Sequence, residues 1–222
     1  MKKGLVNLLW AILGFIVGIL LIYVFLFKIC SPEDVTGLVY SDSANVSRMS
    51  SGVETDSESE DVIDLAFKTA QYIKNGDYAS LSSISHPVYG VVFTPYSTVD
   101  LASDLCFSNS EIASFGNDDK TYVWGMSNGD DTPIEMTPSA YFSRYVFNRD
   151  YTLAPVIGNN YVIQTGNSLE NVSEVFPDAR FVDLHYPSTD SESHDWSTLR
   201  LVYEDYEGEL MLVAVIHCEY TV

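Results

Sequence analysis

The sequence predicts an α+β protein held at a membrane by one N-terminal transmembrane helix. Three observations predict this: an uncharged apolar run over residues 4–27, helix-like periodicity at the start of residues 59–222, and three strand-like runs at the end. Helices that precede a closing antiparallel sheet are typical of α+β domains. Residues 59–222 are also enough for one sizeable hydrophobic core.

Residues 4–27 are long enough to cross a bilayer, because a spanning helix needs about 20 apolar residues. Two lysines precede this run and Lys28 alone follows it. The positive-inside bias therefore predicts that residues 1–3 are cytoplasmic and that the rest is extracytoplasmic. A cleaved signal peptide has a shorter apolar core and a small-residue cleavage site, and bulky Ile29 before Cys30 disfavours a lipoprotein signal. We therefore expect an uncleaved anchor that contacts membrane lipid.

The next segment, residues 28–58, is rich in Ser, Asp and Glu and poor in apolar groups. Such a segment cannot bury enough surface to offset chain entropy, so we expect a flexible acidic tether. All 31 Asp and Glu follow residue 28, with only eight of the 11 Lys and Arg, which leaves this part with a net charge of about −23. This charge repels nucleic acid, so no nucleic-acid partner is expected. It suits a solvated surface or a cationic partner.

The extracytoplasmic domain, residues 59–222, is predicted to begin with a long helix. Ser57 and Glu60 match a capping box, and Gly76 follows the last periodic residue. Asp77 can cap a short second helix that stops before Pro87. Apolar and small residues recur at helical spacing in the first helix: Val62, Leu65, Ala66, Thr69, Tyr72 and Ile73.

The middle of the domain is predicted to alternate between short elements. A strand over residues 91–93 follows the second helix, and Gly90 allows its tight entry. Another strand is predicted over residues 122–124. Thr137-Pro138 is typical of an N-cap with proline at the first helical position, and residues 167–175 suggest one more short helix.

The end of the domain is predicted to be β-structure, over residues 181–186, 196–204 and 209–220, with Gly208 in the last turn. We expect a curved antiparallel sheet wrapped around the first helix, as in the cystatin-like or NTF2-like architecture. This choice depends on the order of the elements.

Several short patterns recur in one order over roughly residues 60–220. They are His86-Pro87, Gly90-Val91, Phe93, Pro95-Tyr96, Trp124-Gly125, Gly166-Asn167-Ser168, Trp196, Leu199-Arg200-Leu201 and Val215-Ile216-His217. With these patterns the chain resembles an uncharacterised family of bacterial extracytoplasmic proteins, some of them lipid-anchored. This chain has a spanning helix where that family would have a lipidated cysteine. The resemblance implies an extracytoplasmic location and a shared fold, and implies no activity.

Histidines are the candidates for chemistry. His86 could act as a general base, but a base needs an orienting partner, and a structural histidine at a helix end is the plainer interpretation. Asp183 with His185, and His217 with Glu219, each place two side chains on one face of a strand. On adjacent strands the four could hold a divalent metal. No motif of known spacing supports this alternative, so we predict neither a metal nor another cofactor.

Aromatic and sheet residues are the candidate ligand contacts. Tyrosines have apolar bodies and polar tips and often line clefts, although the same side chains also fill cores. If Tyr203 faces Leu210 across the last turn, then Trp196, Arg200 and His217 share one sheet face. That mixed face suits the lining of a cleft. The candidate ligand-contacting residues are Trp196, Arg200, His217, His86, Tyr96, Trp124, Tyr141 and Tyr145.

Two cysteines lie in the folded part. Cys106 and Cys218 could form one disulfide outside the cell. They could also remain free thiols, since buried free cysteines are common.

The anchor, the acidic tether and the lack of a recognisable catalytic motif predict a binding domain of the bacterial cell envelope. Its ligand would be a peptide, a glycan or another envelope protein. The alternative is an envelope hydrolase that uses a histidine in the sheet cleft.

Overall fold

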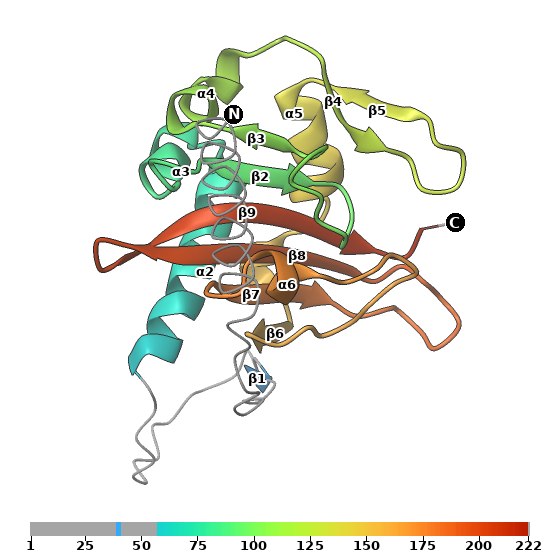
Figure 1. Cartoon of the computed structure of the whole chain (residues 1–222). Coiled ribbons are helices and arrows are strands. Elements are labelled where there is room, and N and C mark those ends of the chain that lie inside the picture. Colours follow the sequence, from blue (N-terminus) through green and yellow to red (C-terminus); the bar gives the residue numbers. More distant parts are fainter. Residues whose placement is uncertain (1–38, 41–56, 222) are drawn as a thin grey trace, which may run out of the picture. The chain divides into compact units, whose positions relative to one another are not determined.

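Residues 39–40 and 57–221 are described in this computed structural model, and they form one large sheet, a separate two-stranded sheet, one long helix and several short ones (Figure 1). The strands of the large sheet are β1 (Val39–Tyr40), β2 (Val91–Thr94), β3 (Leu105–Phe107), β6 (Val156–Asn159), β7 (Arg180–Tyr186), β8 (Ser197–Tyr206) and β9 (Glu209–Glu219), and those of the small sheet are β4 (Tyr122–Met126) and β5 (Pro133–Met136). The helices are α2 (Ser57–Asn75), α3 (Tyr78–Ser83), α4 (Asn109–Ser114), α5 (Pro138–Tyr141) and α6 (Val172–Val175), with short helical turns η1 (Phe115–Asn117), η2 (Phe142–Val146) and η3 (Tyr151–Leu153).

The strand order of the large sheet is β1-β6-β7-β8-β9-β2-β3. Neighbouring strands are antiparallel except β2 and β9, which run parallel, with Val92 opposite Ala214. The protein is therefore α+β, as predicted, with a mixed sheet. The prediction of an antiparallel sheet is wrong at this pair, because β2 joins the edge of a hairpin that lies far along the chain and no local turn signals that pairing.

Local signals place the helix ends. The Asp77 carboxylate accepts a hydrogen bond from the backbone N–H of Ser80 at 3.0 Å, and the Thr137 hydroxyl accepts one from the backbone N–H of Ala140 at 3.3 Å. Gly76, just after α2, has φ +62°, the left-handed conformation that commonly ends a helix. Both predicted caps and this stop are confirmed, whereas the last predicted helix is shorter than expected and forms only α6.

Two apolar clusters cover opposite faces of the large sheet. On the helix face α2 packs against the sheet, and the Tyr203 hydroxyl donates a hydrogen bond to Thr69 Oγ1 at 2.9 Å. The helix face carries Val182, Leu184, Leu199, Leu201, Tyr203, Leu212 and Val215. On the loop face α6 and neighbouring loops cover the sheet (Figure 1). The loop face carries Phe181, Trp196, Val202, Val213, Ala214, Ile216 and Cys218.

A β-bulge at Val213 decides which residues of the last hairpin share a face. Val213 has no partner across β8, because its two neighbours pair with consecutive residues there. Beyond the bulge His217 lies opposite Leu199 on the helix face, whereas Arg200 and Trp196 belong to the loop face. The prediction that Trp196, Arg200 and His217 share one face is therefore wrong. One extra residue in a strand transfers every later side chain to the opposite face.

The predicted transmembrane segment, residues 4–27, lies outside the described residues, as does most of the predicted tether. Within the described ranges no helix is both long and apolar enough to cross a membrane. Two residues of the predicted tether form β1, which pairs with β6. This departs from the expectation of an unstructured segment, because Val and Tyr favour strands and β6 has an edge to be paired.

Cys106 and Cys218 do not form the disulfide that the sequence left open. Cys106 is exposed on β3 and Cys218 is buried on β9, with β2 between the two strands. Burial raises the pKa of the Cys218 thiol to about 12. Cys218 is therefore an inert core residue at neutral pH.

Gly90→Ala is expected to lower the free energy of unfolding by about 2–4 kcal/mol. Gly90 has φ +71°, and a Cβ there would lie 2.4 Å from the carbonyl oxygen of Phe107. Gly208→Ala is the matched control, because Gly208 has φ +87° with nothing within 4 Å of an added Cβ. In that control the free energy of unfolding should fall by about 1 kcal/mol, which is the cost of a positive φ for alanine without a steric clash. Chemical denaturation measures both, and equal losses would contradict the prediction.

Candidate functional site

His86 caps the corner between α3 and β2 and is 3% exposed. Its Nδ1 accepts hydrogen bonds from the backbone N–H groups of Val88 and Tyr89, at 3.2 and 2.9 Å, and its ring stacks on Tyr89. One imidazole thereby fixes the turn that leads from α3 into β2. This geometry favours the structural interpretation of His86 over the catalytic one.

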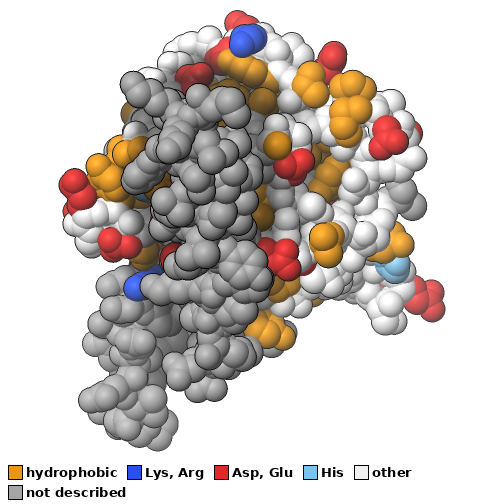
Figure 2. All heavy atoms as spheres, viewed as in Figure 1, with side chains coloured by type: hydrophobic (Ala, Val, Ile, Leu, Met, Phe, Trp, Pro, Cys, Tyr) orange, Lys and Arg blue, Asp and Glu red, His pale blue; other side chains and the backbone are white. Residues whose placement is uncertain are grey.

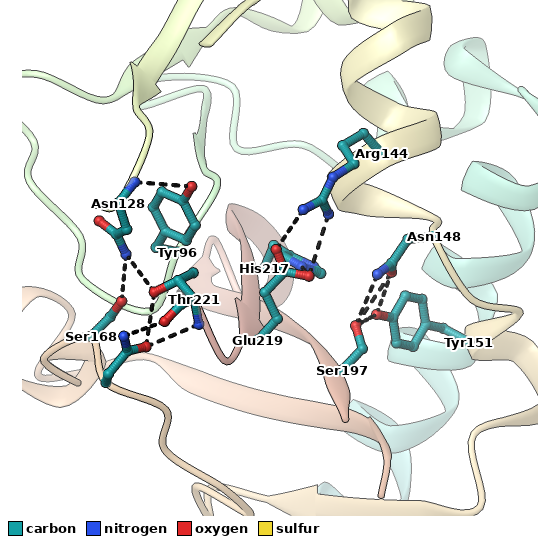
Figure 3. A network of polar contacts seen from close by, with 11 residues as sticks. Tyr96, Asn128, Arg144, Asn148, Tyr151, Ser168, Ser197, His217, Glu219 and Thr221 are labelled. Carbon is teal, nitrogen blue, oxygen red and sulfur yellow. Dashed lines mark hydrogen bonds and ion pairs between the residues drawn. The ribbon is translucent and has the colours of Figure 1, made fainter. Parts of the chain in front are cut away.

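His217 is the buried member of a cluster of ionisable side chains near the end of β9. Its Nε2 lies 3.1 Å from Glu219 Oε2, and the same carboxylate accepts hydrogen bonds from Arg144 at 2.7 and 3.3 Å (Figure 3). Burial acts to raise the pKa of Glu219, but the contacts with His217 and Arg144 outweigh it and lower that pKa to about 2. The ring edge of Tyr145 packs against His217, which is 1% exposed. The cluster joins β9 to η2 and lines neither cavity described below.

The structure does not bring together the four residues of the metal alternative. Asp183 and His185 project from the loop face of β7, whereas His217 and Glu219 project from the helix face of β9, and β8 lies between these strands. In the part of the chain that the structure describes, no group of three His, Cys, Asp or Glu side chains could hold a metal. His185 shares a hydrogen bond of 2.7 Å with Thr198, and burial lowers the pKa of its imidazole.

Arg200 forms a buried ion cluster on the loop face. Its Nε and one terminal nitrogen donate to the two oxygens of Asp183 at 2.6 and 2.9 Å, and the other terminal nitrogen contacts the Glu170 carboxylate. Burial acts to lower the pKa of Arg200, but the Asp183 carboxylate outweighs it, so the guanidinium stays charged. The Arg200 side chain has no exposed surface and is enclosed by its partners and the ring of Phe181. Arg200 is therefore a structural residue and not an open ligand contact.

Trp124 and Tyr141 stack on each other in the main core. Their ring centroids are 3.8 Å apart with an interplanar angle of 7°, and Trp124 Nε1 donates to the carbonyl oxygen of Met136 at 2.8 Å. Both side chains have 0% exposure. These two candidate ligand contacts fill the core, which is the alternative that the sequence left open, and Tyr145 is buried beside them.

Trp196 lies at the base of a cavity of about 370 Å³, here named the Trp196 pocket. The pocket is lined by Gln164, Thr165, Gly166, Asn167, Ser188, Asp190, Ser191, Ser193, His194, Trp196 and Tyr220. Trp196 itself is only 3% exposed, whereas Tyr220 is 39% exposed and its ring meets that of His194 edge-on. Polar loop residues thus form most of this pocket.

A second cavity of about 370 Å³ surrounds Tyr96 and is here named the Tyr96 pocket. It is lined by Thr94, Pro95, Tyr96, Thr98, Asp100, Ser103, Asp104, Val123, Gly125, Met126, Asn128 and Ser168. Three segments that are far apart in the sequence build it. Val123 and Met126 of β4 contribute exposed apolar surface, and Asp100 and Asp104 contribute carboxylates. The pocket therefore combines apolar and acidic side chains.

Hydrogen bonds connect the three segments of the Tyr96 pocket. The Asn128 backbone N–H donates to the Tyr96 hydroxyl at 3.3 Å, and its side-chain amide donates to Ser168 at 2.9 Å and to Thr221 at 3.2 Å (Figure 3). Asn167 Oδ1 accepts a hydrogen bond from the Thr221 backbone N–H at 3.0 Å. These contacts hold the walls in place, so the pocket is preformed.

Asp104 is the least satisfied charged group of the Tyr96 pocket. Its Oδ2 accepts a hydrogen bond from the Asp100 backbone N–H at 2.8 Å. No Lys, Arg or His among the described residues forms an ion pair with it. Burial raises the pKa of Asp104 to about 6, against the lowering effect of that hydrogen bond. A partly desolvated carboxylate without a counter-ion can be stabilised by a cation from outside the protein.

Asp104→Asn is expected to raise the free energy of unfolding at pH 7 by about 1 kcal/mol. The folded-state pKa, about 6, lies above the ordinary value of 3.8, so ionisation destabilises the folded chain as pH rises from about 4 to about 6. Because the carboxyl is only half-buried, solvent screening reduces the effect below the full value for such a shift. Chemical denaturation at pH 4 and pH 7 measures this. The exposed Asp119→Asn variant is the control, and an equal gain in both variants would contradict the prediction.

Comparison of the chain with family models, curated proteins and solved structures finds no match. The class of protein is therefore defined by the molecule itself. It is an α+β domain with a mixed sheet and a preformed pocket that is both apolar and acidic.

Sequence reasoning identified few residues of the two cavities. Tyr96 and Trp196 were candidate ligand contacts, and each lines a cavity. Their role in binding a ligand stays a prediction. Asp104, Val123 and Met126 were missed. No sequence pattern marks Asp104, and the exposure of the two apolar residues was not predictable without knowing which face of β4 packs on the core.

Proposed function

We propose that this chain is a membrane-anchored binding domain of the bacterial cell envelope and that the Tyr96 pocket is its ligand site. The observation that carries the proposal is one preformed cavity that combines exposed apolar side chains with a carboxylate that forms no ion pair with any described basic side chain. Ligand sites in proteins commonly combine an apolar lining with a few placed polar groups. A peptide or an exposed segment of another envelope protein would suit this lining.

The location of the domain is part of the same proposal. The uncharged segment over residues 4–27, the lysines before it and the resemblance to bacterial extracytoplasmic proteins support it. Protease added to intact protoplasts should remove the domain. Full protection of the domain until the cells are lysed would contradict the proposed orientation.

We also propose that the fold is related to the cystatin-like or NTF2-like architecture. The long helix α2 against one face of a mainly antiparallel sheet supports this relation. The parallel pair of β2 and β9 is a departure from the all-antiparallel sheet that we expected.

An envelope hydrolase is the second candidate function, favoured by the 3.1 Å distance between His217 Nε2 and Glu219 Oε2. A histidine beside a carboxylate is a common general base. Against this role, His217 is 1% exposed and lines neither cavity. Hydrolase activity of the full-length chain that disappears in a folded His217→Gln variant would favour the enzyme.

Capture of envelope components from membranes of the source organism tests the binding function. The full-length chain is compared with Met126→Lys, which places a charge in the Tyr96 pocket, and with Leu153→Lys, which changes an exposed apolar residue outside it. We expect the captured component to be lost with Met126→Lys and retained with Leu153→Lys. Capture that is equal for all three proteins would overturn the assignment of the pocket.

A further inference from the structure

We propose, on the basis of that function, that the Tyr96 pocket selects an organic cation: an alkylammonium group attached to a small apolar body. The inference goes beyond the existence of a binding site, because it states the charge and the chemical class of the ligand. Two features of the pocket carry it.

The first feature is the uncompensated negative charge at one part of the pocket. Asp100 and Asp104 line it together, and among the described residues neither forms an ion pair with a basic side chain. Asp100 has its oxygens engaged by Ala102 and Ser103, whereas within the described residues Asp104 accepts one hydrogen bond, from the Asp100 backbone. The remaining oxygen of Asp104 is therefore available to a ligand donor. An ammonium group supplies three such donors together with the missing positive charge.

The second feature is the apolar surface next to these carboxylates. Val123 and Met126 are 47% and 48% exposed in the pocket, and Leu101 and Leu169, in the adjoining segments, are 59% and 69% exposed. A ligand that covers this surface gains from apolar burial. The surroundings also favour cations, because acidic side chains are spread over the visible face of the molecule and basic ones are few (Figure 2).

Three probes of similar size and different charge test this selectivity with the full-length chain in detergent micelles. They are phenethylamine, phenethyl alcohol and 3-phenylpropionate, and ligand-observed NMR titration gives the Kd of each. At pH 7.5 we expect phenethylamine to bind at least about tenfold more tightly than the alcohol, and the propionate to bind more weakly than both. Equal affinity for amine and alcohol would overturn the proposal, as would preference for the propionate.

Changes of pH and of single residues test the role of Asp104. Between pH 7.5 and pH 5 the amine should lose about tenfold in affinity as Asp104 is protonated, while the alcohol should not change. The ionisable groups around Asp104 are Asp100, Tyr96 and the buried Tyr141, and burial raises the pKa of the Tyr141 hydroxyl. Asp104→Asn should bring the amine to the affinity of the alcohol, and Asp119→Asn should leave both unchanged. Amine affinity that is independent of pH and of Asp104 would overturn the proposal.

One further comparison distinguishes two sources of the ammonium group, a free small amine and a lysine side chain of a peptide. Phenethylamine represents a free small amine, and Nα-acetyl-lysine N-methylamide represents a lysine side chain of a peptide. Tighter binding of either one supports the proposal and identifies the source, and binding of neither overturns it. If the alcohol binds as well as the amine, the cation proposal fails but the pocket remains a ligand site. If capture from membranes does not depend on Met126, the proposed function fails instead.

Discussion

Arg200→Met is expected to lower the free energy of unfolding by about 3–5 kcal/mol, because it leaves a buried carboxylate without a counter-ion. Asp183 and Arg200 both have 0% side-chain exposure, and two hydrogen bonds of 2.6 and 2.9 Å join them. Without the guanidinium, Asp183 still accepts the hydrogen bond from the Ile163 backbone N–H at 3.1 Å, and no described basic side chain replaces its counter-ion. Urea denaturation of the full-length chain, followed by near-ultraviolet circular dichroism, measures the loss.

The control for this prediction removes the buried charge as well as its partner. In the double variant Asp183→Leu, Arg200→Met no ionised group of the pair is left in the core, so we expect a loss of less than about 2 kcal/mol. The double variant should therefore be more stable than the single one. If the single variant loses less than about 1 kcal/mol, Asp183 is solvated or neutral and the ion cluster does not hold the loop face.

Trp124→Ala is expected to lower the free energy of unfolding by about 3–5 kcal/mol through loss of a large buried side chain. Trp124 is fully buried, stacks on Tyr141 and donates a hydrogen bond of 2.8 Å to Met136. Truncation leaves a cavity beside Tyr141 and removes the hydrogen bond to the Met136 carbonyl oxygen. The same denaturation experiment measures the effect.

The neighbouring residue provides the control. Val123 lies in the same strand on the opposite face and is 47% exposed, so Val123→Ala should cost less than about 1 kcal/mol. Similar losses for the two variants would mean that β4 does not pack as described. The contrast also tests the pocket, since Val123 is available to a ligand only if Trp124 faces inward.

Helix caps and tight turns could be predicted because they depend on residues within a few positions of one another. Asp77 and Thr137 accept hydrogen bonds from the backbone three residues later, as their positions indicated. Gly90 and Gly208 have the positive φ that their turns require. The closing strands were predictable for a similar reason, since their apolar and β-branched residues favour extended structure over runs of several residues.

The faces of the last hairpin could not be predicted in the same way. Placement of the bulge at Val213 depends on how β9 packs between β8 and β2, and these contacts join distant segments. Because that one residue is unpaired, His217 lies on the helix face, opposite to the face that carries Arg200. The ion partners of Arg200 could not be predicted for the same reason, because Asp183 on β7 and Glu170 before α6 also lie in distant segments.

The sequence by itself determined the local structure, the acidic character and the α+β class of this protein, because each follows from composition or from short-range periodicity. The tertiary structure alone decided which side chains are accessible. Tyr141 and Trp124 lie in the core, whereas Asp104 and Met126 line the Tyr96 pocket. The physical reason is that the pocket is assembled from three segments joined by Asn128, and an assembly of distant segments leaves no pattern in any one of them.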